Sequence, residues 1–353
     1  MISSRAMWFG RGPDIAEIGV DSNLFVENPA MSRLFFLPVV VAACLLLPFA
    51  APAAGKKVLY VDSYHADYIW SADILRGVKN VLESRRDIDL RVFYMDTKRN
   101  KSVDEVIAAA LAAKNIIEEW QPDVVIAADD NASRYLIAPF YKFSPLPFVF
   151  CGLNWDADLY GFPLPNVTGM LEVALYEDTM EALRGLARGE RIGYLASDTE
   201  SERKELDNIR KRFGSDFTVR LVTTFTDLQA AFVELQQSCD MLILQECRSV
   251  EGFDHAAMMR FIEEQTQIPS AAMQKYLMHY ALITFAKVGE EQGEWAARTA
   301  LAILGGKAPG MIPLAENRQA RIFLNMEVAH RLNLKFPREL LDGATFTSEV
   351  PPE

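Results

Sequence analysis

Polar and aromatic side chains gather where short apolar runs of this sequence end. The clearest run spans 57–61, and the segment after it supplies the candidate residues Ser63, Tyr64, His65, Tyr68 and Trp70. In a parallel α/β sheet, ligands bind beyond the carboxyl ends of the strands. The aromatic rings are suited to stacking against a flat or apolar ligand group, although Tyr68 and Trp70 could equally pack the following helix onto its sheet.

Two further runs, 123–129 and 147–152, end in the same manner. Their candidate residues are Asp129, Asp130, Asn131, Gly152, Asn154 and Trp155. Asp129 is suited to holding a ligand ammonium group, whereas Asp130 or Asn131 could simply cap the next helix. Gly152 allows close approach of a ligand, and Asn154 offers both a donor and an acceptor. Trp155 is a second possible stacking surface.

The second half of the chain carries another set of strand-end candidates: Ser197, Glu246, Arg248 and Tyr276. Ser197 or Asp198 could cap the helix predicted over 201–213. Glu246 and Arg248 could pair with each other at the surface. If Arg248 instead faces a ligand, its planar guanidinium suits a carboxylate.

These runs belong to a regular alternation of strands and helices. We expect strands at 57–62, 89–96, 123–129, 147–152, 167–172, 191–197, 217–224, 240–246, 269–274 and 281–287. We expect helices at 71–85, 102–120, 131–141, 176–188, 201–213, 226–238, 255–266 and 290–305. Such alternation predicts parallel sheets covered by helices on both faces. Two sheets are favoured over one, because strongly twisted open sheets seldom exceed about ten strands.

Three irregular zones, 152–169, 277–280 and 305–313, interrupt the alternation. We interpret them as crossings between two lobes that leave a cleft between them. The expected lobe 1 spans 57–165 plus 281–312, and the expected lobe 2 spans 166–280 plus 313–341.

The segment 31–54 has the pattern of a secretory signal peptide. Arg33 is followed by an apolar stretch over 34–49 and then by small residues. Residues 1–30 lack this pattern, so we interpret Met31 as the true start and expect a periplasmic protein. Residues 41–44 also resemble a lipoprotein attachment box, but the apolar residues after Cys44 argue against a lipid anchor there.

Composition narrows the class of function. A net charge of -12 without a basic stripe argues against nucleic-acid binding. The common phosphate-loop, dinucleotide and hydrolase signatures are absent, and the histidines lack metal-ligand spacing. We therefore expect no catalytic residues, no metal and no cofactor. Of the mature cysteines, Cys239 and Cys247 flank a strand that separates them by roughly 26 Å, so we expect buried thiols.

The chain resembles the ABC-transporter substrate-binding proteins that include tryptophan- and tyrosine-type binders. The resemblance rests on "KKVLYVDSYHADYIW", "PFVFCGLNW" and "NVTGM", and on an ending that contains "GEWAARTALAILGGKAPGMIPL" and "FLNMEVAHRLNLKFPRELL". It covers roughly residues 57–341. It implies the type I periplasmic binding fold, with two Rossmann-like α/β lobes joined by a three-stranded hinge, and ligand contacts from loops at the strand tips.

The resulting hypothesis is an exported, monomeric solute-binding protein. It would capture a small organic solute, aromatic or amino-acid-like, and deliver it to an ABC permease. The "SYHADYIW" tip resembles versions of this domain linked to signalling, so an alternative is a ligand sensor acting on a membrane kinase or cyclase. A third hypothesis is an enzyme that uses Asp129, Glu246 and His65 for acid–base chemistry.

Overall fold

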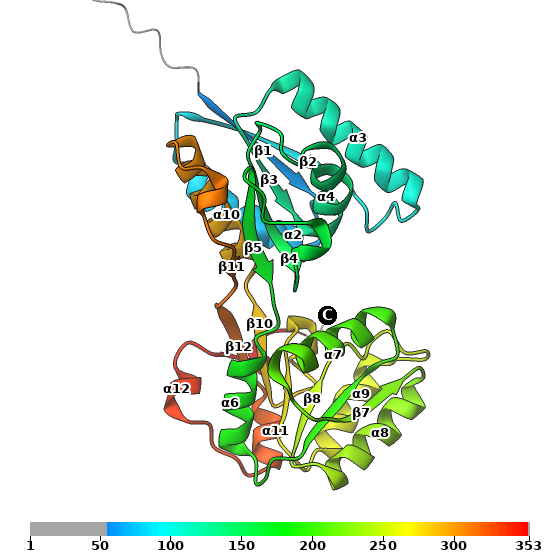
Figure 1. The fold of residues 1–353 in the computed structure, drawn as a ribbon. Coiled ribbons are helices and arrows are strands. Elements are labelled where there is room, and N and C mark those ends of the chain that lie inside the picture. The colour runs from blue at the N-terminus through cyan, green and yellow to red at the C-terminus, as the bar shows by residue number, and fades with distance from the viewer. Residues whose placement is uncertain (1–54, 352–353) are drawn as a thin grey trace, which may run out of the picture. The chain divides into compact units, whose positions relative to one another are not determined.

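The computed structural model describes residues 55–351 of the chain. The expected start at Met31, the signal peptide over 31–54 and the possible lipid attachment at Cys44 lie outside this range. Ala54–Glu353 is one compact unit by its internal contacts, and its described part contains two sheets with their helices, shown in Figure 1. We call these sheets and the helices on them lobe 1 and lobe 2.

Lobe 1 is built on a six-stranded sheet of order β11-β5-β4-β3-β1-β2. Its strands are all parallel: β1 (Lys56–Asp62), β2 (Ile88–Tyr94), β3 (Val124–Ala128), β4 (Phe148–Asn154), β5 (Val167–Glu172) and β11 (Ala315–Glu316). Its helices are α2 (Ile69–Leu82), α3 (Val103–Trp120), α4 (Asp129–Ala132), α5 (Ala138–Phe140) and α10 (Gly289–Leu304).

The two faces of the lobe 1 sheet are covered by different helices. Leu59 and Val61 of β1 belong to one core with α3, whereas Val58 and Tyr60 belong to another with α2 and α10. This division follows from the alternation of side chains along a strand. Since both faces are covered, the central strands read as continuous apolar runs in the sequence.

Lobe 2 is built on a seven-stranded sheet of order β13-β12-β10-β9-β8-β6-β7. Its strands are β6 (Ile192–Ser197), β7 (Thr218–Val222), β8 (Met241–Leu244), β9 (Ser270–Ala272), β10 (Ile283–Lys287), β12 (Ala320–Leu324) and β13 (Thr345–Phe346). Its helices are α6 (Tyr176–Leu186), α7 (Glu200–Phe213), α8 (Phe225–Ser238), α9 (His255–Gln265), α11 (Met326–Arg331) and α12 (Arg338–Leu341).

One strand pair departs from the parallel sheets that we expect. β12 runs antiparallel to β10, with Thr284 opposite Phe323. The chain reaches β12 directly from lobe 1, without the crossover helix that returns a parallel strand to the same side of a sheet. The α/β fold with two mostly parallel sheets is otherwise confirmed.

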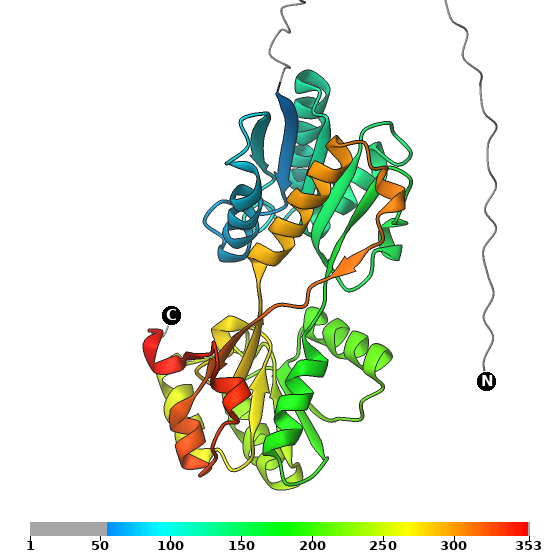
Figure 2. The same ribbon diagram turned by 90° about the vertical axis from the view of Figure 1, so that its left-hand side faces the viewer.

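The chain crosses between the lobes three times, at 173–175, 288 and 317–319, and these connections are visible in Figure 2. All three lie later in the sequence than the expected boundaries at 165/166, 280/281 and 312/313. The reason is hydrogen-bonded pairing: β5 and β11 pair within the first sheet, and β10 pairs with β9 in the second.

The helix expected over 131–141 is broken in the structure. It begins two residues early as α4, continues as a π-helical turn over Ser133–Ile137 and ends as α5. Pro139, which has no backbone N–H, lies in this last piece. Among the described residues, Cys151, Cys239 and Cys247 are buried and unbridged, as expected.

Candidate functional site

Ser63, at the tip of β1 beside the aromatic residues, makes hydrogen bonds within lobe 1. Ser63 is fully buried; its hydroxyl donates to the Ala128 carbonyl at 2.6 Å and accepts the Ala132 amide at 2.9 Å. Ser63 therefore connects β1 to the end of β3 and to the last residue of α4. A ligand would have to compete with both bonds to reach this hydroxyl.

Tyr64 and Tyr68 pack edge to face, with ring centroids 5.1 Å apart. The Lys98 ammonium lies 4.4 Å from the Tyr64 centroid and 5.0 Å from the Tyr68 centroid. His65 contacts Tyr68 and bonds Asp67 through Nδ1 at 2.7 Å. The aromatic tip thus already stacks against a cation of the chain itself.

Trp70 packs the following helix onto its sheet, which is one of the two alternatives that the sequence left open. Its ring packs against the lobe 1 core that contains α2 and α10. Its indole Nε1 also donates to Asp129 Oδ1 at 3.1 Å.

Asp129 is the most unusual residue at the strand tips. It is 1% exposed, has a left-handed φ of 66° and its Oδ2 has no hydrogen-bond partner. Burial, with the nearby carboxylates of Asp62 and Glu172, raises its pKa well above the ordinary value. Gly152, also left-handed at φ 67°, leaves room for this carboxyl, because a Cβ there would lie 3.0 Å from Asp129 Oδ1.

The neighbouring polar residues are engaged within lobe 1. Asp130 accepts hydrogen bonds from Asn154 Nδ2 at 2.6 Å and from the Tyr160 hydroxyl at 2.7 Å, and Asn131 donates to Thr97 at 2.8 Å. The expectation that Asp130 or Asn131 caps the next helix is wrong, since that helix begins at Asp129 and has no side-chain cap.

Trp155 connects the two lobes. It follows β4 with a left-handed φ of 56°, and its indole Nε1 donates to Glu205 Oε2 of α7 at 2.6 Å. Its ring packs against the cores of both lobes. This contact brings the strand tips of lobe 1 to the first turns of α7.

In lobe 2, Ser197 ends β6 and is 1% exposed, and its hydroxyl has no partner. The cap of α7 is Thr199, which accepts the Glu202 amide at 3.2 Å, so the cap expected at Ser197 or Asp198 is wrong. Asp198 instead pairs with Arg203 at 2.6 Å.

Glu246, Arg248 and Tyr276 form a group beyond β8 and β9. Glu246 Oε1 accepts the backbone amides of Arg248 at 2.5 Å and Ser249 at 3.1 Å, and the Arg248 guanidinium lies 4.6 Å from the Tyr276 centroid. Burial and a hydrogen bond to Glu246 raise the pKa of Tyr276.

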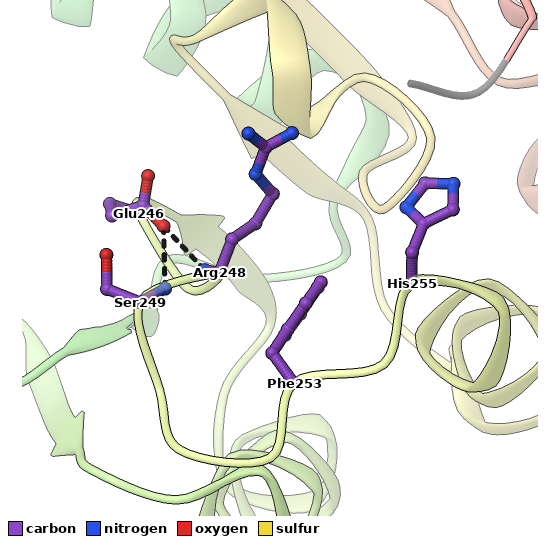
Figure 3. Close-up of a pocket in the computed structure, with 5 residues that line it drawn as sticks. All are labelled: Glu246, Arg248, Ser249, Phe253 and His255. Carbon is purple, nitrogen blue, oxygen red and sulfur yellow. Dashed lines mark hydrogen bonds between the residues drawn. The ribbon is translucent and has the colours of Figure 1, made fainter.

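An open cavity of about 460 Å³ lies at this end of lobe 2 and is lined by Glu246, Arg248, Ser249, Phe253 and His255. Arg248 and His255 point to the same side of the loop, with Phe253 between them (Figure 3). His255 Nδ1 bonds the Tyr280 hydroxyl. A second cavity, of about 650 Å³, is lined by residues such as Asp240 and Pro269, which precede β8 and β9 and so lie at the amino ends of the strands.

Four charged residues near the tips were not among the predicted site residues: Glu172, Glu202, Glu205 and Lys287. Glu172 ends β5 and pairs with Lys287, which ends β10. The strand-end rule applied to these two would have found them. Glu202 and Glu205 occur in a strongly charged helix, so their sequence pattern is that of a solvated face, yet Glu202 is only 7% exposed.

Charged neighbours among these four residues shift the pKa values of Glu202, Glu205 and Lys287. Burial, together with Glu205 and Glu246, raises the pKa of Glu202 to about 8. Burial also raises the pKa of Glu205, although Lys287 and Trp155 oppose this shift. Burial opposes the charge of Lys287, but Glu172 and Glu205 outweigh it and raise its pKa.

Within residues 55–351, no helix is long and apolar enough to span a membrane, and no group of three or more His, Cys, Asp and Glu side chains is arranged to hold a metal ion.

The fold, together with the charged residues Glu172, Glu202, Glu205 and Lys287 near its strand tips, defines a class: the type I periplasmic binding protein fold. A ligand-free, open substrate-binding protein with adhesive properties from Clostridium difficile is similar over 82% of this chain and 98% of its own, at 16% identity and a TM-score of 0.66. A domain from Streptococcus pneumonia in complex with L-Trp is similar over 83% and 99%, at 14% identity and a TM-score of 0.53. A periplasmic ribose ABC transporter protein from Conexibacter woesei reaches 0.50, at 15% identity over 81% and 97%.

The family follows from the sequence. Residues 72–347 match the family described as ABC transporter substrate binding protein, and the chain belongs to it. Proteins of this family bind solutes and are typically extracellular or periplasmic. No curated protein matches the sequence.

Proposed function

We propose that this chain is an exported, periplasmic solute-binding protein that captures a small organic solute between its lobes and delivers it to an ABC permease. Family membership supports this proposal. The observation that carries it is the hydrogen bond from Trp155 to Glu205, because it joins a strand-tip side chain of lobe 1 to a side chain near the start of α7 in lobe 2.

The proposed contact residues are those at the strand tips. They are Ser63, Tyr64, His65, Tyr68, Trp70, Asp129, Asp130, Asn131, Gly152, Asn154, Trp155, Ser197, Glu246, Arg248 and Tyr276. Asp129 and Ser197 have the strongest support, because each is buried and keeps a side-chain oxygen without a partner. Buried polar groups in proteins are otherwise almost always hydrogen-bonded.

Closure of the lobes on the solute would couple capture to docking on the permease. A ligand needs only to bind the closed arrangement better than the open one. Aromatic rings from both lobes, such as Tyr64 and Tyr276, would pack against an apolar part of the solute.

Thermal unfolding of residues 55–353 with a library of amino acids, amines, nucleosides and organic acids tests the proposal. A ligand at about 100 times its dissociation constant should add roughly 2.7 kcal/mol to the free energy of unfolding. We expect one chemical class of hits, recovered unchanged after incubation. A hit that is consumed would contradict binding without catalysis and would favour an enzyme.

The gene neighbourhood separates transport from sensing. Permease and ATPase genes beside this one would support delivery to a transporter. A kinase or cyclase gene without them would contradict delivery and favour a sensor.

A further inference from the structure

Five carboxyl groups from both lobes interact electrostatically near the strand tips. We call them the acidic cluster; they are Asp129, Glu172, Glu202, Glu205 and Glu246. In addition to burial, Glu172 raises the pKa of Asp129 and that of Glu205, and Glu205 and Glu246 raise the pKa of Glu202. Hydrogen bonds fix two members of the group: Lys287 donates to Glu172, and Trp155 donates to Glu205. Like charges at this density disfavour one another unless a cation lies among them.

Two members of the cluster are buried with an oxygen that has no partner. Asp129 is 1% exposed with Oδ2 unpartnered, and Glu202 is 7% exposed with Oε2 unpartnered. An unsatisfied buried oxygen costs free energy that a hydrogen-bond donor would recover. Each of these two oxygen atoms therefore indicates, independently of the other, a position for a hydrogen-bond donor of the ligand.

Cations of the chain itself already lie against the same surfaces. Lys287 bonds Glu172 and interacts with Glu205 and Asp129. Lys98 lies over the rings of Tyr64 and Tyr68. Even with Lys287 and Arg248 counted against it, the acidic cluster contains more carboxyl groups than cations.

Two aromatic residues of lobe 1 interact with members of the cluster. Tyr64 interacts electrostatically with Asp129, and Trp155 donates its N–H to Glu205. Aromatic faces next to carboxylates are the arrangement that recognises organic ammonium groups, through cation–π attraction and charge together.

We propose that the solute is an organic cation whose positively charged nitrogen lies beside Asp129 in the acidic cluster and whose carbon skeleton packs against Tyr64 and Trp155. This inference rests on the proposed solute-binding function and specifies its substrate class. A solute carboxylate is not required for binding.

Matched probes that share a ring and differ in charge test the inference. Thermal unfolding is followed with tryptamine, tryptophan and indole-3-propionate, with the corresponding tyramine series, and with choline and spermidine. We expect amines to raise the unfolding midpoint and the acids to leave it unchanged. Hits confined to acids, or to amino acids whose decarboxylated amines fail, would overturn the cation while leaving solute binding intact. No shift with any compound of the full library would overturn both.

Asp129→Asn tests the assigned position of the nitrogen. The amide keeps an acceptor for Trp70 but cannot ionise beside a bound cation, so we expect at least tenfold weaker binding of the best amine by calorimetry. Glu202→Gln, which lies in the other lobe, should weaken it in the same direction. The control is Glu234→Gln on α8, which removes an exposed charge paired with Arg220 of β7 and should leave affinity unchanged. Unchanged affinity in both cluster variants would overturn the assignment, and the unfolding midpoint without ligand verifies that each variant folds.

Discussion

At the scale of single residues, the strand-tip side chains fall into two groups. Ser63, Asp130 and Asn131 have hydrogen bonds within lobe 1 that position the tips. Asp129 and Ser197 retain an unpartnered oxygen although they are buried. Serine and aspartate occur in both groups, so hydrogen-bonding state, and not residue type, distinguishes the proposed contact residues with the strongest support.

The raised pKa of Glu202 predicts how the stability of the folded protein depends on pH. Its pKa is about 8 in the folded protein, against an ordinary value of 4.5, because of burial and of Glu205 and Glu246, with Lys287 acting in the opposite direction. The folded state therefore binds more protons than the unfolded state between these values, and stability falls as pH rises through this window. The slope is at most about 1.4 kcal/mol per pH unit for one group.

Glu202→Gln should remove this contribution. We expect the variant to lose less stability than the parent between pH 5 and pH 8 and to be the more stable protein at pH 8, as measured by urea unfolding. Glu200→Gln on the same helix is the control, because Glu200 is exposed and Lys204 lowers its pKa. Superimposable curves for parent and Glu202→Gln would contradict the prediction.

At the scale of elements, helix α10 is held against α2 by close backbone approach. A Cβ at Gly293 would overlap the Ile74 carbonyl oxygen of α2, and a Cβ at Gly77 would overlap the Glu290 carbonyl oxygen of α10. Because α10 begins just after a crossing, this contact fixes the helix that leads from lobe 2 back into lobe 1.

Gly293→Ala should therefore destabilise the protein, by about 1–3 kcal/mol, since packed backbone has no room for an added methyl group. Gly185→Ala in α6 is the matched control: no atom lies within 4 Å of its added Cβ. Alanine there should stabilise by about 0.5–1 kcal/mol through helix propensity. Denaturant unfolding measures both, and equal effects of the two substitutions would show that backbone proximity is not the cause.

At the scale of the whole molecule, side chains connect the crossings to one another. Asn317, which is 4% exposed, accepts the Val173 amide at 2.7 Å and donates to the Val173 carbonyl at 3.2 Å. Glu172 pairs with Lys287. Glu172 ends the strand before the connection at 173–175, and Lys287 ends the strand before the connection at 288. These side-chain bonds hold the three connections next to one another.

Asn317→Ala should leave both backbone groups of Val173 without their partner. We expect a loss of about 1–3 kcal/mol in the free energy of unfolding and faster hydrogen exchange at the Val173 amide. The exposed Asn100→Ala serves as control. Unaltered protection at Val173 would argue that Asn317 does not hold the hinge.

The sequence by itself determined the ten main strands and the alternating helices, because apolar runs and helical periodicity are local patterns that burial on both faces of a sheet imposes. It also marked Asp129 and Trp155, since both follow strand ends. The strands β11, β12 and β13 and the break in the helix after Asp129 are not among these predictions.

Only the tertiary structure decided which sheet each strand joins, and hence where the crossings lie. It alone assembled the acidic cluster, because Asp129, Glu205 and Glu246 are far apart in sequence and come into one group only through folding. Burial likewise changes the chemistry of a carboxyl group that is ordinary in sequence, as Glu202 illustrates. Long-range proximity and desolvation are properties of the packed molecule, and no local pattern of residues contains them.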